Sequence, residues 1–573
     1  MASLKIRLIP GFVYGLRHAS LHLIASNEFA YGGCIPLAGE KTDRSHCDGA
    51  LRRLVDDYLE LWALAGFPSS NGCKWVSASS VFVSSAFVGL ADAAVLIENL
   101  IRIDEHSDPG FGRRALEELV QRAKSALPLG YNTIHFIKAA DQMDMTWLYV
   151  SRARNLIQYG EGSRLHVMDS SLTDQQSLLG GRLAQDKALS TSYLRSLGYP
   201  VQTNRCISNL DEARSFASDH YPVVVKPVNA DRGEDVELDI RDEATLASIV
   251  ARLLEKYPSL LVEKYLDGSD YRLIVWKGCL VWAYRRNRPC VVGDGTSSIA
   301  DLLSAENQRL SSSSSARYPR SILQDRSFDQ CLADQGFDLS SVLLRGEVCV
   351  VGVYGLLFRG GSPEACLDCV HPDNARLAVD CCEQIGVDLA GIDLVMPDIS
   401  VSWKDSAAHI CEVNVKPMLG FHSQEHLPLL ILESLVGSGH MPAVLMVVSD
   451  QSPLAEAIGQ WLSLQQDTLG FGLWSSVQRD LHAMRPVMDR RFSSCVALMR
   501  DQDLALEGAP LPVFGQVLIE QPLMESFNQD QRDLLLGYYG RTSVSAPELM
   551  TFADYSEFVR LALQLLSQLS IAA

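Results

Sequence analysis

Two apolar segments of this 573-residue chain carry ionisable or amide side chains at positions where a buried strand would have only apolar ones. In "LAGIDLVMPDIS" (389–400) the interruption is Asp393, and in "AHICEVNVKPMLGFH" (408–422) it is Glu412 followed by Asn414. A carboxylate buried in a strand needs a counter-charge beside it, because an unpaired buried ion costs several kcal/mol. The two segments therefore restrict the fold to one that joins buried strands around a polar site.

The strand period predicts how these side chains are arranged. Alternate residues of a strand share a face, so Glu412 and Asn414 are predicted to project together, with Cys411 and Val413 on the opposite face. Together with Asp393, they form an all-oxygen set of the kind that Mg²⁺ prefers. Because a divalent cation would supply the missing counter-charge, the pattern predicts a metal site at Asp393, Glu412 and Asn414.

Two lysines are candidates for binding phosphate. In "YPVVVKP" (221–227) three valines predict a buried strand, and the final proline ends its hydrogen bonding, which places Lys226 at the strand end. Upstream, "AQDKALSTSYLRSLGYPV" (184–201) predicts an amphipathic helix with Lys187 in its first turn. A lysine ammonium is a compact charge suited to phosphate oxygens, although a lysine at a strand end is more often only solvated.

A third segment has the pattern of an adenine-binding hinge. "LLVEKYLDGSDYRLIVWKG" (260–278) predicts a strand, a turn at Gly268 and a second strand. Glu263 and Leu266 lie where the first strand ends, and Asp270 follows the turn. Such an edge can pair an adenine through backbone N–H and C=O groups while a carboxylate binds the ribose hydroxyls. An ordinary charged hairpin is the alternative.

Composition excludes several classes of partner. The 69 acidic residues against 50 basic ones give a formal net charge of −19 without any basic cluster, which disfavours nucleic acids and anionic membranes. The longest apolar stretch, 76–101, is interrupted by Asp92 and Glu98, so it predicts a buried strand and an amphipathic helix rather than a membrane span. The first residues have no signal-peptide pattern, and the 14 cysteines lack framework spacing, so we expect free thiols in a reducing cytoplasm.

The length predicts three or four domains of roughly 100–200 residues each, in an α/β chain. Residues 1–165 mix short strands with helices such as 113–127. Residues 166–435 contain the motifs described above. Residues 440–573 begin with a continuous apolar run, 441–450, followed by a helical pattern, which predicts a small doubly wound, Rossmann-like domain.

Together these motifs resemble the ATP-grasp ligases and, among them, the cyanophycin synthetases. The resemblance runs from about residue 154 to residue 422 and includes "QYGEGSR", "AQDKALS", "VVVKP", "YLDGSDYRLIV", "PCVVGDGTSSIADLL", "VHPDNARLAV", "GVDLAGIDLV" and "CEVNVKPMLGFH". Bacterial glutathione synthetase and D-alanine–D-alanine ligase are more distant in pattern. The resemblance implies an α+β ATP-grasp domain pair, preceded by the amino-terminal domain of the same family.

The resemblance also implies a role for each candidate. Lys187 and Lys226 would contact the ATP phosphates, Glu263, Leu266 and Asp270 the adenine and ribose, and Asp393, Glu412 and Asn414 one or two Mg²⁺ ions. An arginine before "VVGDG" stabilises the acyl-transfer intermediate in the family. Here Arg286 and Arg288 are both candidates, and Arg286 is preferred. Ser163 and Arg164 match a substrate-contacting segment.

The phosphate loop departs from the family pattern, which is similar to "DGNHGRGV". In the aligned "NADRGEDV" (229–236), Ala230 and Asp235 replace glycines, Arg232 replaces a histidine and Glu234 replaces an arginine. Glycines let backbone N–H groups close on phosphate oxygens, and acids repel them. Arg232 restores a cation that can bind phosphate. Because the other ligands are all present, we expect a loop that is altered rather than inactive.

The carboxy-terminal block departs further. In cyanophycin synthetases a Mur-ligase-like module follows, opened by the P-loop "RIPIVAVTGTNGKTTT". Here "HMPAVLMVVSDQSPLAEAIGQWL" (440–462) lacks the phosphate-binding glycines, lysine and threonine. The resemblance therefore implies a degenerate Mur-ligase-like domain that cannot organise ATP in the usual way.

The function implied is an ATP- and Mg²⁺-dependent carboxylate–amine ligase. It would join amino-acid-type small molecules through an acyl phosphate, release ADP and phosphate, and make one amide bond per substrate. The resemblance also implies a homo-oligomer, a dimer or a tetramer. Two alternatives stay open: a nucleotide-binding regulatory protein without catalysis, and a polymer-extending ligase of the cyanophycin type. The sequence does not name the two substrates.

Overall fold

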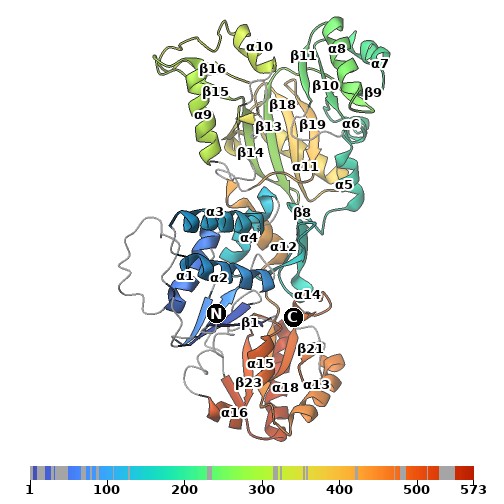
Figure 1. Ribbon diagram of the computed structural model, residues 1–573. Helices are drawn as coiled ribbons and strands as arrows, with labels where there is room; N and C mark the ends of the chain where they lie inside the picture. Colours follow the sequence, from blue (N-terminus) through green and yellow to red (C-terminus); the bar gives the residue numbers. More distant parts are fainter. Residues whose placement is uncertain are drawn as a thin grey trace. The chain divides into compact units, whose positions relative to one another are not determined.

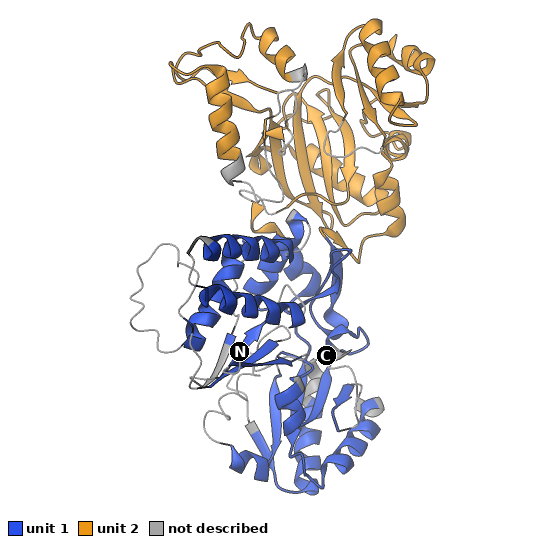
Figure 2. Ribbon diagram, viewed as in Figure 1, with its two compact units in different colours: residues 1–169, 429–573 blue, residues 170–428 orange. Residues whose placement is uncertain are grey.

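The computed structural model describes residues 4–9, 20–26, 31, 50–65, 73–77, 80–85, 90–106, 109–126, 130–228, 235–313, 321–322, 326–352, 355, 359–419, 424–469, 471–477, 485–512, 514–527 and 549–572. The fold is mixed α/β, as predicted, with several separate sheets (Figure 1). The chain forms two compact units: unit 1 is residues 1–169 with 429–573, and unit 2 is residues 170–428 (Figure 2). The predicted division into three domains stays a prediction.

Unit 1 begins with an antiparallel sheet in the order β1-β2-β4-β3. Its elements are β1 (Leu4–Ile9), β2 (Ser20–Ala25), α1 (Ala50–Leu64), β3 (Cys73–Ser77), β4 (Ser80–Ser84), α2 (Leu90–Asp104), α3 (Pro109–Ala126) and α4 (Tyr131–Gln142). The strand and helix predicted within 76–101 are present as β4 and α2, and the helix predicted at 113–127 is α3. Helical spacing places Leu54 and Leu61 of α1 on one fully buried face.

A small antiparallel sheet follows in unit 1, with β6 between β5 and β7. Its elements are β5 (Trp147–Ser151), β6 (Leu156–Tyr159), the 3₁₀ helix η2 (Gly162–Arg164) and β7 (His166–Asp169). The buried carboxylate of Glu161 accepts hydrogen bonds from Thr146 Oγ1 at 2.6 Å and from the Met441 N–H at 3.0 Å. This buried acid therefore ties the early part of unit 1 to its carboxy-terminal part.

The carboxy-terminal part of unit 1 is a parallel sheet in the order β21-β22-β20-β23-β24. Its elements are α12 (Leu427–Val436), β20 (Ala443–Val448), α13 (Ala455–Leu469), β21 (Gly472–Ser475), α14 (Arg485–Met488), β22 (Cys495–Arg500), α15 (Asp501–Glu507), β23 (Gln516–Glu520), α16 (Gln521–Ser526), β24 (Leu549–Phe552) and α18 (Tyr555–Ala572). Side chains of α13 and α18 form the core on one face, and those of α14, α15 and α16 form it on the other. The predicted strand and helix are thus β20 and α13, in a doubly wound sheet.

Unit 2 contains a four-stranded sheet in the order β11-β10-β12-β9. Its elements are β9 (Asn204–Ile207), α7 (Leu210–Ala217), β10 (Val223–Pro227), β11 (Glu237–Ile240), α8 (Glu243–Leu254) and β12 (Leu260–Lys264). Val223, Val225, Leu260 and Val262 pack with apolar side chains of α7 and α8 on one face. Because alternate residues of a strand point to opposite faces, the other side chains of β10 and β12 project from the face away from this core.

The second sheet of unit 2 has five antiparallel strands in the order β17-β14-β13-β18-β19. Its elements are α5 (Leu178–Gln185), α6 (Lys187–Ser196), β13 (Ser269–Trp276), β14 (Cys279–Asn287), β17 (Ser362–Ala365), α11 (Pro372–Ile385), β18 (Leu389–Met396) and β19 (His409–Asn414). Helix α11 packs against one face, where Tyr271, Leu273, Ile392 and Leu394 are buried with Leu377. The opposite face carries the polar side chains described below.

The remaining elements of unit 2 are β8 (Leu172–Thr173), β15 (Cys290–Val292), α9 (Ile299–Ser313), α10 (Arg326–Asp334), β16 (Val348–Val350) and the 3₁₀ helix η4 (Leu367–Cys369). Strands β15 and β16 pair with each other, and Val291, Leu303, Phe328 and Cys349 form a small core between them and the helices α9 and α10. This substructure is separate from the two sheets that carry the predicted site.

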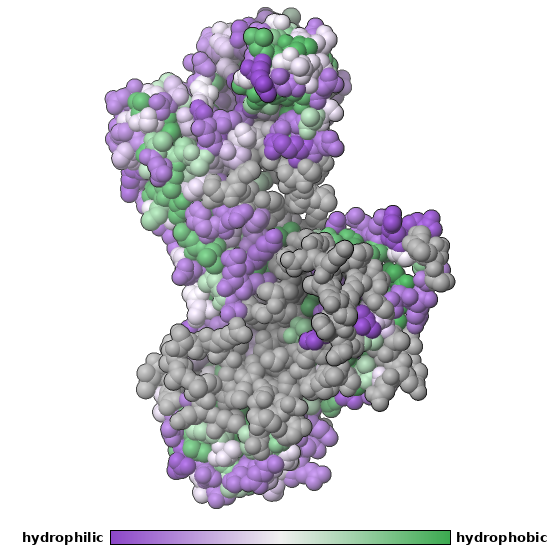
Figure 3. Space-filling view, turned by 90° about the vertical axis from the view of Figure 1, so that its left-hand side faces the viewer, coloured by the Kyte–Doolittle hydropathy of each residue, from purple (hydrophilic) through white to green (hydrophobic). Residues whose placement is uncertain are grey.

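Of the helices that the structure describes, none combines the length and apolar character needed to span a bilayer. The apolar stretch 76–101 contributes to the sheet and helices of unit 1 instead. On the face shown in Figure 3, hydrophilic and hydrophobic side chains are interspersed over the coloured parts.

Candidate active site

Lys226 and Glu263 form an ion pair on the face of the four-stranded sheet opposite its core. Strands β10 and β12 are antiparallel neighbours, with Val224 opposite Glu263, so the side chain of Lys226 lies diagonally across from that carboxylate. The Nζ to Oε2 distance is 2.6 Å, and the two side chains are only 17% and 4% exposed. Burial by itself lowers the pKa of Lys226, but Glu263 outweighs it and the pKa lies above its ordinary value.

Both predicted lysines lie beside strand β19. The Cys411 thiol and the Glu412 carboxylate contribute further to the raised pKa of Lys226, which brings β10 and β19 to one site. Lys187 is the first residue of α6, and its Nζ lies 3.8 Å from Glu412 Oε2. The Glu412 carboxylate therefore lies near Lys187 and also acts on the charge of Lys226.

Asp393 is held by two arginines. Arg272 lies directly opposite Asp393 in the register of β13 and β18, and its Nε and Nη2 bind the two carboxylate oxygens, with Nη2 to Oδ2 at 2.9 Å. Arg286 donates to the same oxygens at 3.1 Å and to Asp270 Oδ2 at 3.0 Å. Burial raises the pKa of Asp393, but the two guanidinium groups outweigh burial and hold the pKa below its ordinary value.

The pairing of Asp393 with two arginines shows that a metal ion is not needed to balance its buried charge. The sequence argument required a divalent cation to balance Asp393, whereas the arginines supply that charge. The three predicted ligands nevertheless share a face, because Asp393 is opposite Glu412 and Gly391 is opposite Asn414 in the register of β18 and β19. Among the described residues, no group of three or more His, Cys, Asp or Glu side chains has the arrangement of a metal site.

The oxygens on this face still fit Mg²⁺ by their chemistry, since two carboxylates and an amide are hard ligands. Among the described residues, the ion-pair partner of Glu412 is Lys187 at 3.8 Å, and Asn414 Oδ1 accepts from the Lys416 N–H at 3.0 Å. Asp393 could join them only by exchanging an arginine for the metal. The three side chains are therefore suitable Mg²⁺ ligands by their chemistry, but the Asp393 carboxylate already binds Arg272 and Arg286.

Sequence reasoning missed Arg272 and Gly391. Arg272 is 7% exposed in the middle of an apolar strand, a signal of the same kind as Asp393 itself. A Cβ on Gly391 would lie 2.6 Å from Arg272 Cδ, so the glycine leaves the space that the arginine side chain crosses to reach Asp393. The pattern "GID" at 391–393 thus carries both the acid and the space for its partner.

The two candidate arginines before "VVGDG" occupy different places. Arg286 lies opposite Asp270 in the register of β13 and β14, and its side chain is 11% exposed. Arg288 is exposed beyond the end of β14, and its charge acts on the thiol of Cys331. Of the two, Arg286 is the one that contacts the acids of this site.

The predicted orientation of Cys411 was wrong. The register of β18 and β19 shifts between Asp393–Glu412 and Leu394–Ile410, which leaves Cys411 as an extra residue in a β-bulge. Ile410 and Val413 both lie in the core, while Cys411 does not. Burial, with the carboxylates of Glu263 and Asp270 near it, raises the pKa of the Cys411 thiol well above its ordinary range, so the thiol lies within the site.

The predicted hinge is a connection between two sheets and not a hairpin. β12 belongs to the four-stranded sheet and β13 to the five-stranded one, joined through Gly268, whose φ is +149°. The N–H groups of Lys264 and Tyr265 donate to backbone carbonyls, at 3.0 and 2.8 Å. Within the described residues the N–H of the next residue, Leu266, has no hydrogen-bond partner, as an adenine-binding backbone group requires.

Only the end of the altered phosphate loop lies in the described residues, and Arg232 lies outside them. Asp235 has a φ of +48°, in the left-handed region that favours glycine, as expected where it replaces one. Its carboxylate accepts from Tyr257 Oη at 2.8 Å and Lys256 Nζ at 3.2 Å, and these bonds lower its pKa. The charge of Asp235 is therefore directed to α8 and the turn after it.

Ser163 and Arg164, the predicted substrate contacts, lie in η2 of unit 1. The Ser163 N–H donates to the Phe492 carbonyl at 2.7 Å, and Arg164 Nη1 donates to the His440 carbonyl at 2.9 Å. These bonds attach η2 to the segments around the carboxy-terminal sheet. The contacts present are structural ones within unit 1, and a role in substrate binding stays a prediction.

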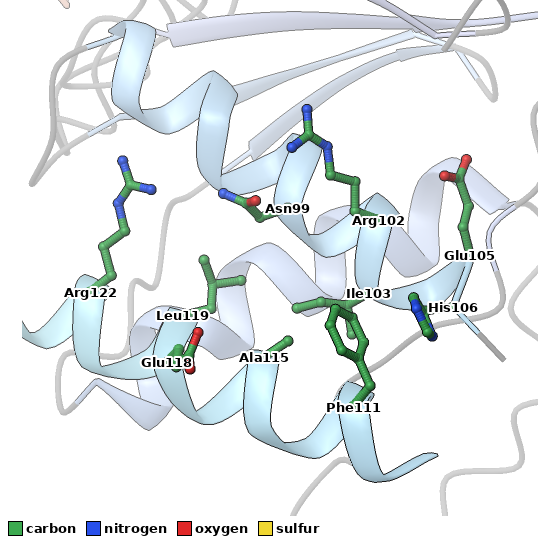
Figure 4. A pocket seen from close by; sticks show the side chains of 10 residues that line it. All are labelled: Asn99, Arg102, Ile103, Glu105, His106, Phe111, Ala115, Glu118, Leu119 and Arg122. Atoms are coloured by element: carbon green, nitrogen blue, oxygen red, sulfur yellow. The ribbon is translucent and has the colours of Figure 1, made fainter. Parts of the chain in front are cut away.

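A cavity of about 610 Å³ lies between α2 and α3 of unit 1 (Figure 4). Arg102 and Glu105 line it from α2 and the turn after it, and Glu118 and Arg122 line it from α3. The charges of these four side chains cancel, and none of the predicted site residues lines the cavity. It is therefore separate from the chemistry argued above.

Comparison with known proteins shows what the chain is similar to. No protein-family profile matches the chain. It is 30% identical over 72% of its length to cyanophycin synthetase from Geminocystis herdmanii, covering 48% of that protein. It is 33% identical over 54% of its length to cyanophycin synthetase from Trichormus variabilis, covering 35% of it. A bifunctional glutathione synthetase from Pasteurella multocida superposes on 60% of this chain and 51% of its own with a TM-score of 0.41 and 19% identity.

The chain spans about half the length, or less, of the curated relatives it matches. Over 72% of its own length, it is a homologue of the cyanophycin synthetases.

Proposed function

We propose that the chain is an ATP-dependent carboxylate–amine ligase that joins amino-acid-type small molecules. The single observation that carries the proposal is the environment of Lys226, a cation on β10 that is paired with Glu263 of β12 and whose pKa the Glu412 carboxylate of β19 also raises. Two sheets thus bring a buried ammonium and a set of oxygen ligands to one site. Its relatives named as cyanophycin synthetases support this class of reaction.

In the first half-reaction, an oxygen of the substrate carboxylate would attack the γ-phosphorus of ATP. The new O–P bond gives an acyl phosphate, and the bond to the β-phosphate oxygen breaks to release ADP. Lys187 and Lys226 would neutralise charge on the transferring phosphoryl group, which is most effective in a site that excludes water. The Leu266 N–H and the Asp270 carboxylate would bind adenine and ribose.

In the second half-reaction, a neutral amine would attack the acyl carbon. The C–N bond forms, the bond between the acyl carbon and the phosphate oxygen breaks, and the released phosphate takes up the proton that the nitrogen loses. Arg286 would stabilise the oxyanion of the tetrahedral intermediate, because its guanidinium already lies on the acidic face beside Asp270 and Asp393. The exposure of Arg288 beyond the end of β14 supports the choice of Arg286.

Asp393, Glu412 and Asn414 would hold Mg²⁺, which would supply charge neutralisation on the β- and γ-phosphates. The structure adds a requirement: Asp393 would have to release at least one arginine oxygen contact to bind a metal. Arg286 is the one with a second acid, Asp270, to which it can remain attached.

A second candidate function, a nucleotide-binding protein without catalysis, is favoured by one observation: both oxygens of Asp393 are occupied by arginines. Incubation with ATP, Mg²⁺ and pools of amino acids separates the two. A ligase releases ADP only when an acid and an amine substrate are both present, and product masses tell one bond from a growing polymer.

The test of the proposed site uses Asp393→Asn and Glu412→Gln. Both variants should lose ADP release by at least about 100-fold, because catalytic electrostatic groups of this kind contribute on the order of 10²–10³ in rate. Their circular dichroism spectra should match the wild type. Unchanged turnover in both variants would remove the proposal.

A further inference from the structure

The loop after β20, in the centre of the carboxy-terminal sheet, is bound by a buried acid from a neighbouring strand. Glu520, the last residue of β23, is 6% exposed. Its Oε2 accepts from the Ser449 N–H at 2.8 Å, and its Oε1 accepts from Ser452 Oγ at 2.7 Å. Both oxygens of one carboxylate therefore bind a loop of four residues.

The other neighbouring strand binds the same loop. Asp501 directly follows β22, and its Oδ1 accepts from the Asp450 N–H at 2.7 Å. Arg500 Nη1 donates to the Asp450 carbonyl at 3.0 Å and lies 3.6 Å from its carboxylate. Two consecutive N–H groups after β20 thus donate to carboxylates that come from opposite sides.

The loop lies at the position where open parallel sheets bind ligands. β20 lies between β22 and β23, and the chain leaves β20 for α13 on one face, whereas β22 and β23 lead to α15 and α16 on the other. Open parallel sheets bind ligands at the carboxyl ends of strands where the connections diverge in this way. Successive backbone N–H groups at such a point form a binding site for anions.

We infer that the carboxylates of Glu520 and Asp501 take the place of a bound anion at the carboxyl end of β20, where open parallel sheets have their ligand crevice, and close this crevice position to phosphate. Among the described residues, the carboxylates of Glu520, Asp501 and the loop residue Asp450 outnumber the single guanidinium of Arg500, so a phosphate would meet a net negative charge. If the crevice is closed, we expect the chain to bind one nucleotide, in unit 2. This expected number of nucleotides rests on the proposed function, whereas the closure of the crevice does not.

The first test removes the internal anion. Glu520→Ala in the full chain should lower the melting temperature by roughly 3–5 °C, because two donors lose their partner. Acetate or inorganic phosphate at about 50 mM should recover at least half of that loss and leave the wild type within about 1 °C, if the vacated site accepts a free anion. Recovery by acetate alone indicates a site shaped for a carboxylate, and recovery by both indicates a general anion site. Either result supports the inference.

Two further variants control for folding. Glu525→Ala, on the exposed side of α16, should change the melting temperature by less than about 1 °C with or without the anions. Glu520→Gln keeps one accepting oxygen, so it should lose less stability than Glu520→Ala and show no recovery. An unchanged melting temperature in Glu520→Ala, or a loss that neither anion reverses, would overturn the inference.

Nucleotide counting provides the second measurement. Equilibrium dialysis of ADP with Mg²⁺ should give one site per wild-type chain and the same count in Asp501→Asn. Two sites in the wild type, with one lost in the Glu520 variants, would show that the crevice binds nucleotide and would overturn its closure. If no ADP binds at all, the proposed function fails, and the melting experiment still decides whether the crevice is an anion site.

Discussion

The two sheets of unit 2 and the carboxy-terminal sheet of unit 1 all carry buried acids, but the partners of these acids differ. Glu263 and Asp393 in unit 2 pair with side-chain cations, Lys226, Arg272 and Arg286. Glu520 in the other sheet pairs with a backbone N–H and a hydroxyl of its own chain. Cations that pair with acids can change partner when a phosphate arrives, whereas backbone donors already satisfied by a carboxylate cannot meet one without breaking the fold.

Two sheets can therefore have intact topology and still differ in whether their charged and donor groups are available to a phosphate. In unit 2 the charges are carried on side chains that can rotate, and the Leu266 N–H has no partner among the described residues. In the carboxy-terminal sheet the donors after β20 are fixed to Glu520 and Asp501. The two regions therefore differ in whether their charged and donor groups can exchange a protein partner for a phosphate. Single substitutions can test this difference.

The largest effect is expected for Lys226→Met, which leaves Glu263 buried without its cation. Breaking a buried pair by removing one partner costs about 3–5 kcal/mol. Nucleotide binding should fall together with the free energy of unfolding. Urea denaturation and ADP titration measure the two, with Lys264→Met, an exposed lysine at the end of the neighbouring β12, as the control. Equal effects in the two lysine variants would contradict the assignment of Lys226.

Arg272→Met should come next, with a loss of about 3 kcal/mol, because Asp393 keeps Arg286 as a second cation. The matched control is Arg285→Met on the same strand pair, where the exposed ion pair with Glu364 contributes about 0–1 kcal/mol. Chemical denaturation of both proteins checks the order. If the two losses are alike, Arg272 is not the principal partner of Asp393.

Gly391→Ala should have an intermediate effect, about 1–3 kcal/mol, since its Cβ would overlap the side chain of Arg272. The loss should shrink in the Arg272→Met background, because methionine can move away from the added methyl group. A double-mutant cycle measures this coupling. Additive losses would place the strain of Gly391→Ala in the backbone rather than at the arginine.

The smallest effect is expected for Asp501→Asn in the carboxy-terminal sheet, about 1 kcal/mol, because the amide oxygen can still accept from the Asp450 N–H. Thermal denaturation measures it, and ADP binding in unit 2 should not change. A loss in nucleotide binding equal to that of Lys226→Met would show that the two regions are not independent and would remove the contrast drawn above.

The sequence predicted the strands and helices well where their apolar pattern was long. The runs at 223–225, 389–396 and 443–448 lie in the strands β10, β18 and β20, because predominantly apolar segments of this length are stabilised by burial in a sheet. It also identified the ionisable residues that interrupt them. It did not identify their partners, because Arg272 and Asp393 are 121 residues apart.

The sequence by itself determined which residue types lie in buried strands and hence which charges need a partner. Only the tertiary structure decided what that partner is. A β-bulge in β19 directs the side chain of Cys411 toward the site. The register of β13 against β18 places Arg272 beside Asp393, where the sequence had predicted a metal ion as the counter-charge. The physical reason is that side-chain direction follows local backbone geometry, whereas charge balance depends on strands that meet only when the chain is folded.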